Sequence, residues 1–216
     1  MDDNSETKSL VQHDTHRPRI GFLSLPLEMR WEIYTYLLFL VDPINTAGHS
    51  HPSNPKVYPQ ILSVCRQTHW EAHEMLYRLN TFLAHPSLLT SFPRLREDYS
   101  PVVSSAMASL VRRAVLRVRL DIKPGFTRAA AAESLSGLEH LEVEVWQADY
   151  RCAGREVLEL LEDVRGCRSA VVSGSTGGFQ CYARWLEETM MKPLGAPHED
   201  YDGEVGDVSP VSPLRD

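Results

Sequence analysis

Cys65, His69 and His73 are the residues whose types and spacing come closest to metal chemistry in this sequence. They recur every four residues within one expected helix, and His49 and His51 precede them in a proline-rich stretch. Thiolate and imidazole are good zinc ligands, and neighbouring turns of a helix can share one ion. The order His-Trp-Glu-Ala-His, however, places its Glu one position later than the His-Glu-x-x-His of zinc proteases. We therefore expect these side chains to lie on the buried stripe of the helix or at its margin, and we expect no metal or cofactor.

The run Ser-Gly-Ser-Thr-Gly-Gly at 173–178 is the second stretch that could do chemistry. It falls between an expected strand and an expected helix, where phosphate-binding loops occur. It lacks the Lys-Ser/Thr of a P-loop and the glycine spacing of a dinucleotide fingerprint. Nothing elsewhere in the sequence pairs a nucleophile with a base. The sequence therefore predicts a strand-to-helix turn and a protein that is not an enzyme, with an enzyme that binds phosphate at this turn as the remaining alternative.

The charge of the chain is concentrated at its ends. The net charge is −7 over 216 residues; residues 199–216 carry −5 and residues 1–19 carry −1, so the body is close to neutral. Such a body argues against a general surface for nucleic acid or anionic membrane. Both polar ends, 1–19 and 193–216, are expected to be disordered. Ser209 and Ser212, each followed by proline, are weak phosphorylation candidates in that acidic tail.

The expected compartment is the cytoplasm and/or the nucleus. The chain starts with a polar, acidic stretch, and no apolar run approaches the ~20 residues that cross a bilayer. None of the four cysteines forms a Cys-x-x-Cys pair, which favours free thiols.

Two amphipathic helices are expected in residues 20–84, separated by a loop insertion at 42–59. The first helix covers 25–40, and four apolar residues recur along it at four-residue spacing: Leu25, Met29, Ile33 and Leu37. The second begins near Pro59 and runs to about residue 79, with Glu71 among the polar residues that face away from its apolar stripe. The tryptophans of the chain are expected to fill cores.

From residue 85 to 192 the sequence alternates between helical and strand patterns. Strands are expected at 114–122, 138–146 and 168–174, with a spacing of roughly 27–28 residues, and a short strand is expected before them at 81–84. The repeating strands should be parallel because each is followed by a crossover helix. The sequence thus predicts an α/β fold (α+β overall), with about three parallel strands and helices on one face, similar to a leucine-rich repeat.

One face of this sheet is expected to be open to solvent, because the first two repeating strands alternate apolar and charged residues. We expect Arg117 and Arg119 to lie opposite Glu142 and Glu144 on that face. The helices that cover the other face are expected at 101–112, 126–136, 154–165 and 179–191.

The two N-terminal helices together resemble an F-box, and the amino-acid sequence of residues 22–84 is most similar to those of F-box-like proteins of filamentous fungi. The family opens on Leu-Pro-x-Glu, continues with a helix that carries Ile and Leu, and later shows Val-Cys-Arg. The matching residues are Leu25, Pro26 and Glu28; Ile33, Leu37 and Leu38; and Val64, Cys65 and Arg66.

This resemblance implies a non-enzymatic module that docks on the Skp-type adaptor protein of a cullin ubiquitin ligase and presents a protein substrate. By the resemblance, seven residues would form the partner-binding surface: Leu25, Pro26, Met29, Ile33, Leu37, Val64 and Cys65. The alternative is a structural or scaffolding protein that keeps the fold and does not bind the adaptor. The resemblance names no substrate.

Overall fold

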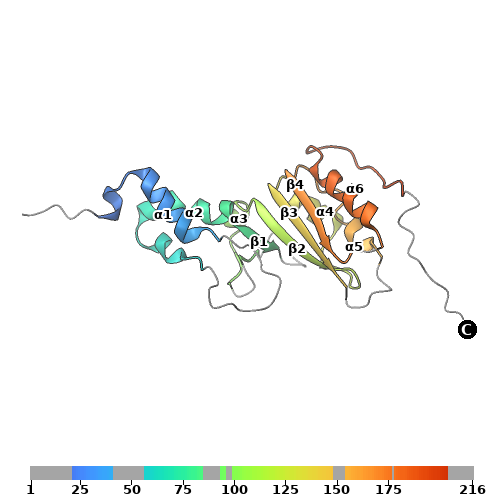
Figure 1. Cartoon of the computed structure of the whole chain (residues 1–216), viewed down its shortest axis with the longest axis horizontal. Coiled ribbons are helices and arrows are strands. Elements are labelled where there is room, and N and C mark those ends of the chain that lie inside the picture. Colours follow the sequence, from blue (N-terminus) through green and yellow to red (C-terminus); the bar gives the residue numbers. More distant parts are fainter. Residues whose placement is uncertain are drawn as a thin grey trace, which may run out of the picture.

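The computed structural model describes residues 21–40, 56–84, 93–95, 99–147, 154–176 and 178–203. In it, a pair of helices lies at one end of the molecule and a sheet covered by further helices at the other (Figure 1). The expectations for residues 1–19, for most of the 42–59 insertion with its two histidines, and for the acidic end from residue 204 lie outside the described residues.

The helical end begins with a short 3₁₀ helix, Phe22–Ser24, followed by α1, Leu27–Leu38. A second 3₁₀ helix, Pro59–Ser63, precedes α2, Arg66–Leu79. The prediction of one continuous helix from Pro59 is therefore wrong. The interruption occurs because Cys65 has an extended backbone and caps α2. Its Sγ accepts the Thr68 backbone N–H at 3.5 Å, and Thr68 Oγ1 accepts the Cys65 N–H at 3.3 Å, which forms a reciprocal capping box.

The sheet contains four parallel strands in the order β1-β2-β3-β4, so the α/β fold is confirmed. Their bounds are Thr81–Ala84, Arg113–Arg119, His140–Trp146 and Ser169–Gly174. The sheet has one strand more than the three predicted, because the short strand β1 pairs with β2. The sheet therefore extends into residues 20–84, where the sequence predicts the helical module.

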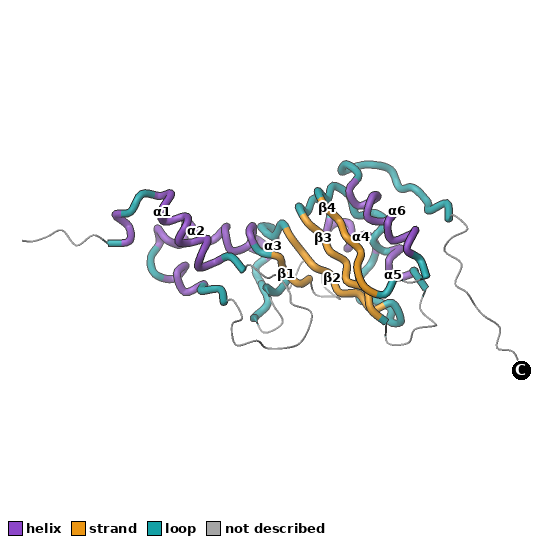
Figure 2. Tube along the Cα trace, in the orientation of Figure 1, coloured by secondary structure: helices purple, strands orange, loops and turns teal. Residues whose placement is uncertain are grey.

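The helices of this half are α3 (Ser105–Ala108), α4 (Arg128–Leu135), α5 (Glu156–Glu159) and α6 (Gln180–Met191). Residues of α4, α5 and α6 share one core with the alternate residues of the strands, so these helices cover a single face of the sheet (Figure 2). Both α3 and α5 are single turns, much shorter than the helices predicted at 101–112 and 154–165, because the chain continues in turns after each of them.

The other face of the sheet carries the predicted charged residues in a partly different register. Arg117 lies opposite Glu144, with Nε and Oε2 2.7 Å apart. Arg119 lies opposite Trp146 and pairs with Asp121, and Glu142 lies opposite Val115. The whole register is therefore shifted by two residues from the expected pairing of Arg117 and Arg119 with Glu142 and Glu144. A shift of two keeps all four side chains on one face, because side chains alternate with a period of two.

Residues 193–203 also have a defined path, so the prediction of disorder from residue 193 onward is wrong for this part of the tail. Contacts from Asp163, Arg165 and Lys192 hold it against the α/β half. In the described part of the chain, no helix has both the length and the apolar character that crossing a bilayer requires.

Two hydrophobic cores meet at β1. Phe82 packs with Tyr34, Leu38 and Ala72 of the helical pair, whereas Ala84, two residues on, belongs to the core of the sheet. Asn80, which is 1% exposed, lies just before β1 and joins the strand to both helices of the pair by hydrogen bonds. Its amide nitrogen donates to the Leu38 carbonyl at the end of α1 and to the Leu76 carbonyl of α2, at 2.8 and 2.7 Å.

The side-chain oxygen of Asn80 accepts the Leu40 backbone N–H at 2.8 Å. One side chain thus satisfies buried groups at the ends of both helices, which have no partner within a helix. The position of the helical pair relative to β1 follows from these three bonds.

We predict that Asn80→Ala destabilises the fold by about 3 kcal/mol, because it leaves one buried N–H and two carbonyl groups unsatisfied. Asn80→Asp keeps the acceptor for Leu40 but turns a buried carboxylate oxygen toward the Leu38 and Leu76 carbonyls, so at neutral pH it should destabilise the fold at least as much as Asn80→Ala does. Urea unfolding followed by circular dichroism measures both effects. Wild-type stability in the alanine variant would contradict this role.

Candidate protein interface

The buried row of α1 differs from the row that apolar spacing selects. Arg30, Tyr34 and Leu38, four residues apart, are the buried residues of the helix. The predicted row that includes Met29 and Ile33 lies beside it, since neighbouring positions of a helix are rotated by about 100°. The helix is therefore attached by a row that contains a charge and a hydroxyl.

Glu71 of α2 is the partner of this buried row. Its carboxylate accepts two hydrogen bonds from the Arg30 guanidinium, at 2.9 and 2.7 Å, and one from Tyr34 Oη at 2.8 Å. Gln67 adds a fourth donor at 2.9 Å. The prediction that Glu71 faces away from the helix interface is wrong, because a carboxylate with this many donors is stable in a partly buried position.

These bonds fix the charge states of the groups involved. Hydrogen bonds, first of all those from Arg30, lower the pKa of Glu71 to about 2. Burial, together with the hydrogen bond to Glu71, raises the pKa of Tyr34 to about 12. The Arg30 guanidinium also donates to the Leu23 carbonyl at 3.3 Å and to the Leu25 carbonyl. The network therefore fixes the segment that precedes the N-terminus of α1 and also packs α1 on α2.

None of the seven predicted partner-binding residues is buried. Met29 and Val64 are 50% and 67% exposed, and Pro26 is exposed as well. The remaining four are partly exposed: Leu25, Ile33, Leu37 and Cys65. We call these seven residues the candidate surface. Within α1, Met29 is half exposed because the helix is attached through the neighbouring row of Arg30 and Tyr34, whereas Leu37 packs partly against the core of the helical pair.

Further large apolar side chains are exposed on the same two helices and the segments before them. Trp31, Tyr36 and Trp70 are 50%, 84% and 77% exposed. The expectation that the tryptophans fill cores is therefore wrong for Trp31 and Trp70, and it is also wrong for Trp146 at the end of β3, which is 47% exposed. Large exposed apolar patches mark interaction sites in soluble proteins. The sequence carried a signal of this, because α1 has more large apolar residues than one buried stripe can accommodate.

The metal candidates do not form a site. Nδ1 of His69 is 3.1 Å from the Leu62 carbonyl and Nδ1 of His73 is 3.0 Å from the His69 carbonyl, so each ring is engaged with the backbone. The Cys65 thiol serves as the α2 cap, and hydrogen bonds from Thr68 lower its pKa. Among the described residues, no group of three or more His, Cys, Asp or Glu is arranged to hold an ion.

The turn after β4 does not favour a phosphate. Ser173 Oγ donates to Glu142 Oε1 at 3.0 Å, so its hydroxyl faces a carboxylate that would repel an anion. Phe179, at the start of α6, offers no side-chain cap. Residue 177 lies outside the described part of the turn.

A cavity of about 300 Å³ lies between α2 and β1. Its lining is mostly apolar, with Tyr77, Phe82 and Met107 among the residues, and the described residues that line it include no charged side chain. The described residues of its lining therefore include no pair of charged side chains of the kind that serves as acid and base in hydrolytic or group-transfer chemistry.

Comparison with protein-family models, with curated proteins and with solved structures gives no match for this chain.

We predict that the attachment of α1 weakens in acid. Because the pKa of Glu71 is depressed from 4.5 to about 2, its stabilising effect is complete above pH 4.5 and is lost as the pH falls through 2. Between pH 4.5 and pH 2, the free energy of unfolding of Glu71→Gln should therefore fall by less than that of the wild type. Urea unfolding midpoints at a series of pH values measure the difference.

The matched control is Glu74→Gln, which makes the same replacement at an exposed position of α2 and leaves the contact with Arg30 intact. An identical acid response in wild type and Glu71→Gln would exclude the ionised Glu71 as the holding group.

Proposed function

We propose that this chain is a non-enzymatic, F-box-like substrate adaptor of the filamentous-fungal type. In this proposal its helical pair docks on the Skp-type subunit of a cullin ubiquitin ligase, and the α/β half faces the protein to be modified. The contact is made by the candidate surface of α1 and the segment before α2. The site of action would be the cytoplasm and/or the nucleus.

One observation carries the proposal: among the residues that resemble the adaptor-contacting positions of an F-box, Met29, Ile33 and Val64 take no part in the core of the helical pair, whereas Leu37 packs partly against it. Arg30 and Tyr34 attach the helix through Glu71, and Met29 and Val64 remain half or more exposed. An amphipathic helix with an unused apolar row is suited to docking in an apolar groove of a partner. Pre-organisation by the Arg30–Glu71 contact reduces the entropy that docking would cost.

A structural or scaffolding role is the second candidate. Tight attachment of α1 to α2 and of both helices to β1 favours it, because such a unit can be retained for stability alone. The two roles differ in one property, which is direct binding to the adaptor.

We predict that Met29→Asp and Val64→Asp each weaken binding to a purified Skp-type adaptor by about tenfold or more. Each loses the ~1.5–3 kcal/mol that burial of such a side chain contributes, and each places a charge in an apolar contact. Isothermal titration calorimetry with the full chain measures this effect.

The control is Ile122→Asp, because Ile122 is 51% exposed, as Met29 is, but follows β2 in the α/β half. This control should bind as the wild type does. If the wild-type chain does not bind the adaptor at all, the adaptor role is excluded and the scaffolding role is favoured.

A further inference from the structure

Residues 193–203 run back past α5 and α6 without forming a helix or strand (Figure 1). The segment starts beside Gly166, whose N–H donates to the carbonyl of Lys192, the residue before the segment, at 2.7 Å. Gly166 has a φ of +76°, and a Cβ there would lie 2.6 Å from Leu194 Cγ. A side chain at this position would therefore displace the segment, so the close approach depends on glycine.

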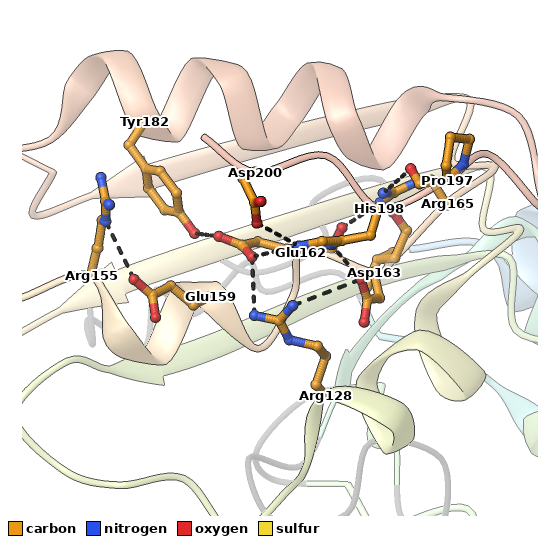
Figure 3. A network of polar contacts seen from close by, with 11 residues as sticks. Arg128, Arg155, Glu159, Glu162, Asp163, Arg165, Tyr182, Pro197, His198 and Asp200 are labelled. Carbon is orange, nitrogen blue, oxygen red and sulfur yellow. Dashed lines mark hydrogen bonds and ion pairs between the residues drawn. The ribbon is translucent and has the colours of Figure 1, made fainter. Parts of the chain in front are cut away.

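Successive residues of the segment have separate partners on the α/β half. The Pro197 carbonyl accepts from Arg165 Nη2 at 3.1 Å, and His198 Nδ1 is 2.9 Å from Asp163 Oδ1 (Figure 3). Glu199 pairs with Lys192 at 2.5 Å, and hydrogen bonding to Lys192 lowers the pKa of Glu199. A segment without helix or strand is thus held residue by residue, through one backbone carbonyl and two side chains, as bound peptides are.

Tyr201 is the aromatic anchor of the segment. Its ring centroid lies 5.2 Å from that of Tyr182 and 5.3 Å from that of Trp185. The Arg155 guanidinium lies 4.7 Å from the Tyr182 ring centroid and 5.1 Å from that of Tyr201. Edge-to-face, tilted and cation–π contacts of this kind are typical of the residues that dominate peptide and protein interfaces.

The groups that hold the segment are themselves fixed by bonds that do not involve it. Glu162, 8% exposed, accepts from Tyr182 Oη at 2.8 Å and from Arg128 Nη2 of α4 at 3.0 Å (Figure 3). Burial and the bond to Glu162 raise the pKa of Tyr182. Arg165, 5% exposed, donates to the carbonyls of Glu162 and Val164. Tyr182 and Arg165 are therefore held by bonds to the α/β half as well as by their contacts with the segment.

We propose that six residues of this region form a binding surface for an extended acidic peptide with a terminal aromatic residue: Arg155, Asp163, Arg165, Tyr182, Trp185 and Lys192. We call it the α5–α6 surface. Residues 197–201, Pro-His-Glu-Asp-Tyr, occupy it within the same chain. A segment of another protein with the same chemistry binds there only by displacing them, so its apparent affinity is reduced by the local concentration of the chain's own segment.

This surface lies at the other end of the molecule from α1 and α2 (Figure 1), and the proposal does not rest on adaptor binding. The distance between the two ends also allows both surfaces to be occupied at once.

The test uses a fluorescein-labelled peptide of residues 197–202 and the full chain with the double substitution His198→Ala and Tyr201→Ala. In the wild type, the chain's own segment competes with the added peptide at an effective concentration in the millimolar range, as short linkers give. The variant's segment has lost two anchors and competes less. Fluorescence anisotropy should therefore show that the variant binds the peptide at least about tenfold more tightly than the wild type does. The same peptide with alanine in place of Tyr201 should not bind. Equal binding of the intact peptide by variant and wild type overturns the proposal.

The matched control is the double substitution His69→Ala and Tyr36→Ala, which removes an exposed histidine and an exposed tyrosine from the helical pair and should behave as the wild type does. A second measurement needs no variant. Nuclear Overhauser effects between Tyr201 and the Trp185 indole in the isotope-labelled wild type should be present and should decrease as unlabelled peptide is added. Their absence in the free chain, or their persistence at saturating peptide, overturns occupancy within the chain.

Discussion

The three hydrogen bonds of Asn80 are the constraint on which the rest of the structure depends. They join the end of α1, the last turn of α2 and the residue before β1 at a single buried side chain. Buried backbone groups at helix ends are costly unless they are paired, so this joint fixes the direction in which the helices leave the sheet. Because β1 is also the first strand of the parallel sheet, the two hydrophobic cores are held in one arrangement by this short segment.

Within the helical pair, a polar contact performs the attachment that an apolar stripe usually performs. Arg30 and Tyr34 hold α1 on α2 through Glu71, and Gln67 and the carbonyls of Leu23 and Leu25 complete the network. The consequence is a division between two rows of one helix. The row with Arg30 is used inside the domain, and Met29 of the neighbouring row stays half exposed.

At the opposite end, polar contacts serve a different purpose. Glu162 links α4 to α6 through Arg128 and Tyr182 and thereby shapes the surface on which residues 197–201 lie. The four parallel strands connect this surface to the helical pair, and their order along the sheet follows their order in the chain. The molecule thus presents one exposed apolar surface and one surface covered by its own chain, with a sheet between them.

The sequence by itself determined the α/β class and the approximate places of α1, α4, α6 and the repeating strands, because periodicity and turn residues are local properties. It did not determine which row of α1 is buried, since Arg30 is stabilised there only by Glu71 from another helix. The register of Arg119 against Trp146 and the ordered path of residues 193–203 were likewise decided by the tertiary structure. An acidic, proline-containing tail has no local reason to be ordered. It becomes ordered because Arg155, Asp163 and Arg165, which are distant in sequence from residues 197–201, are brought beside them by the packing of the α/β half.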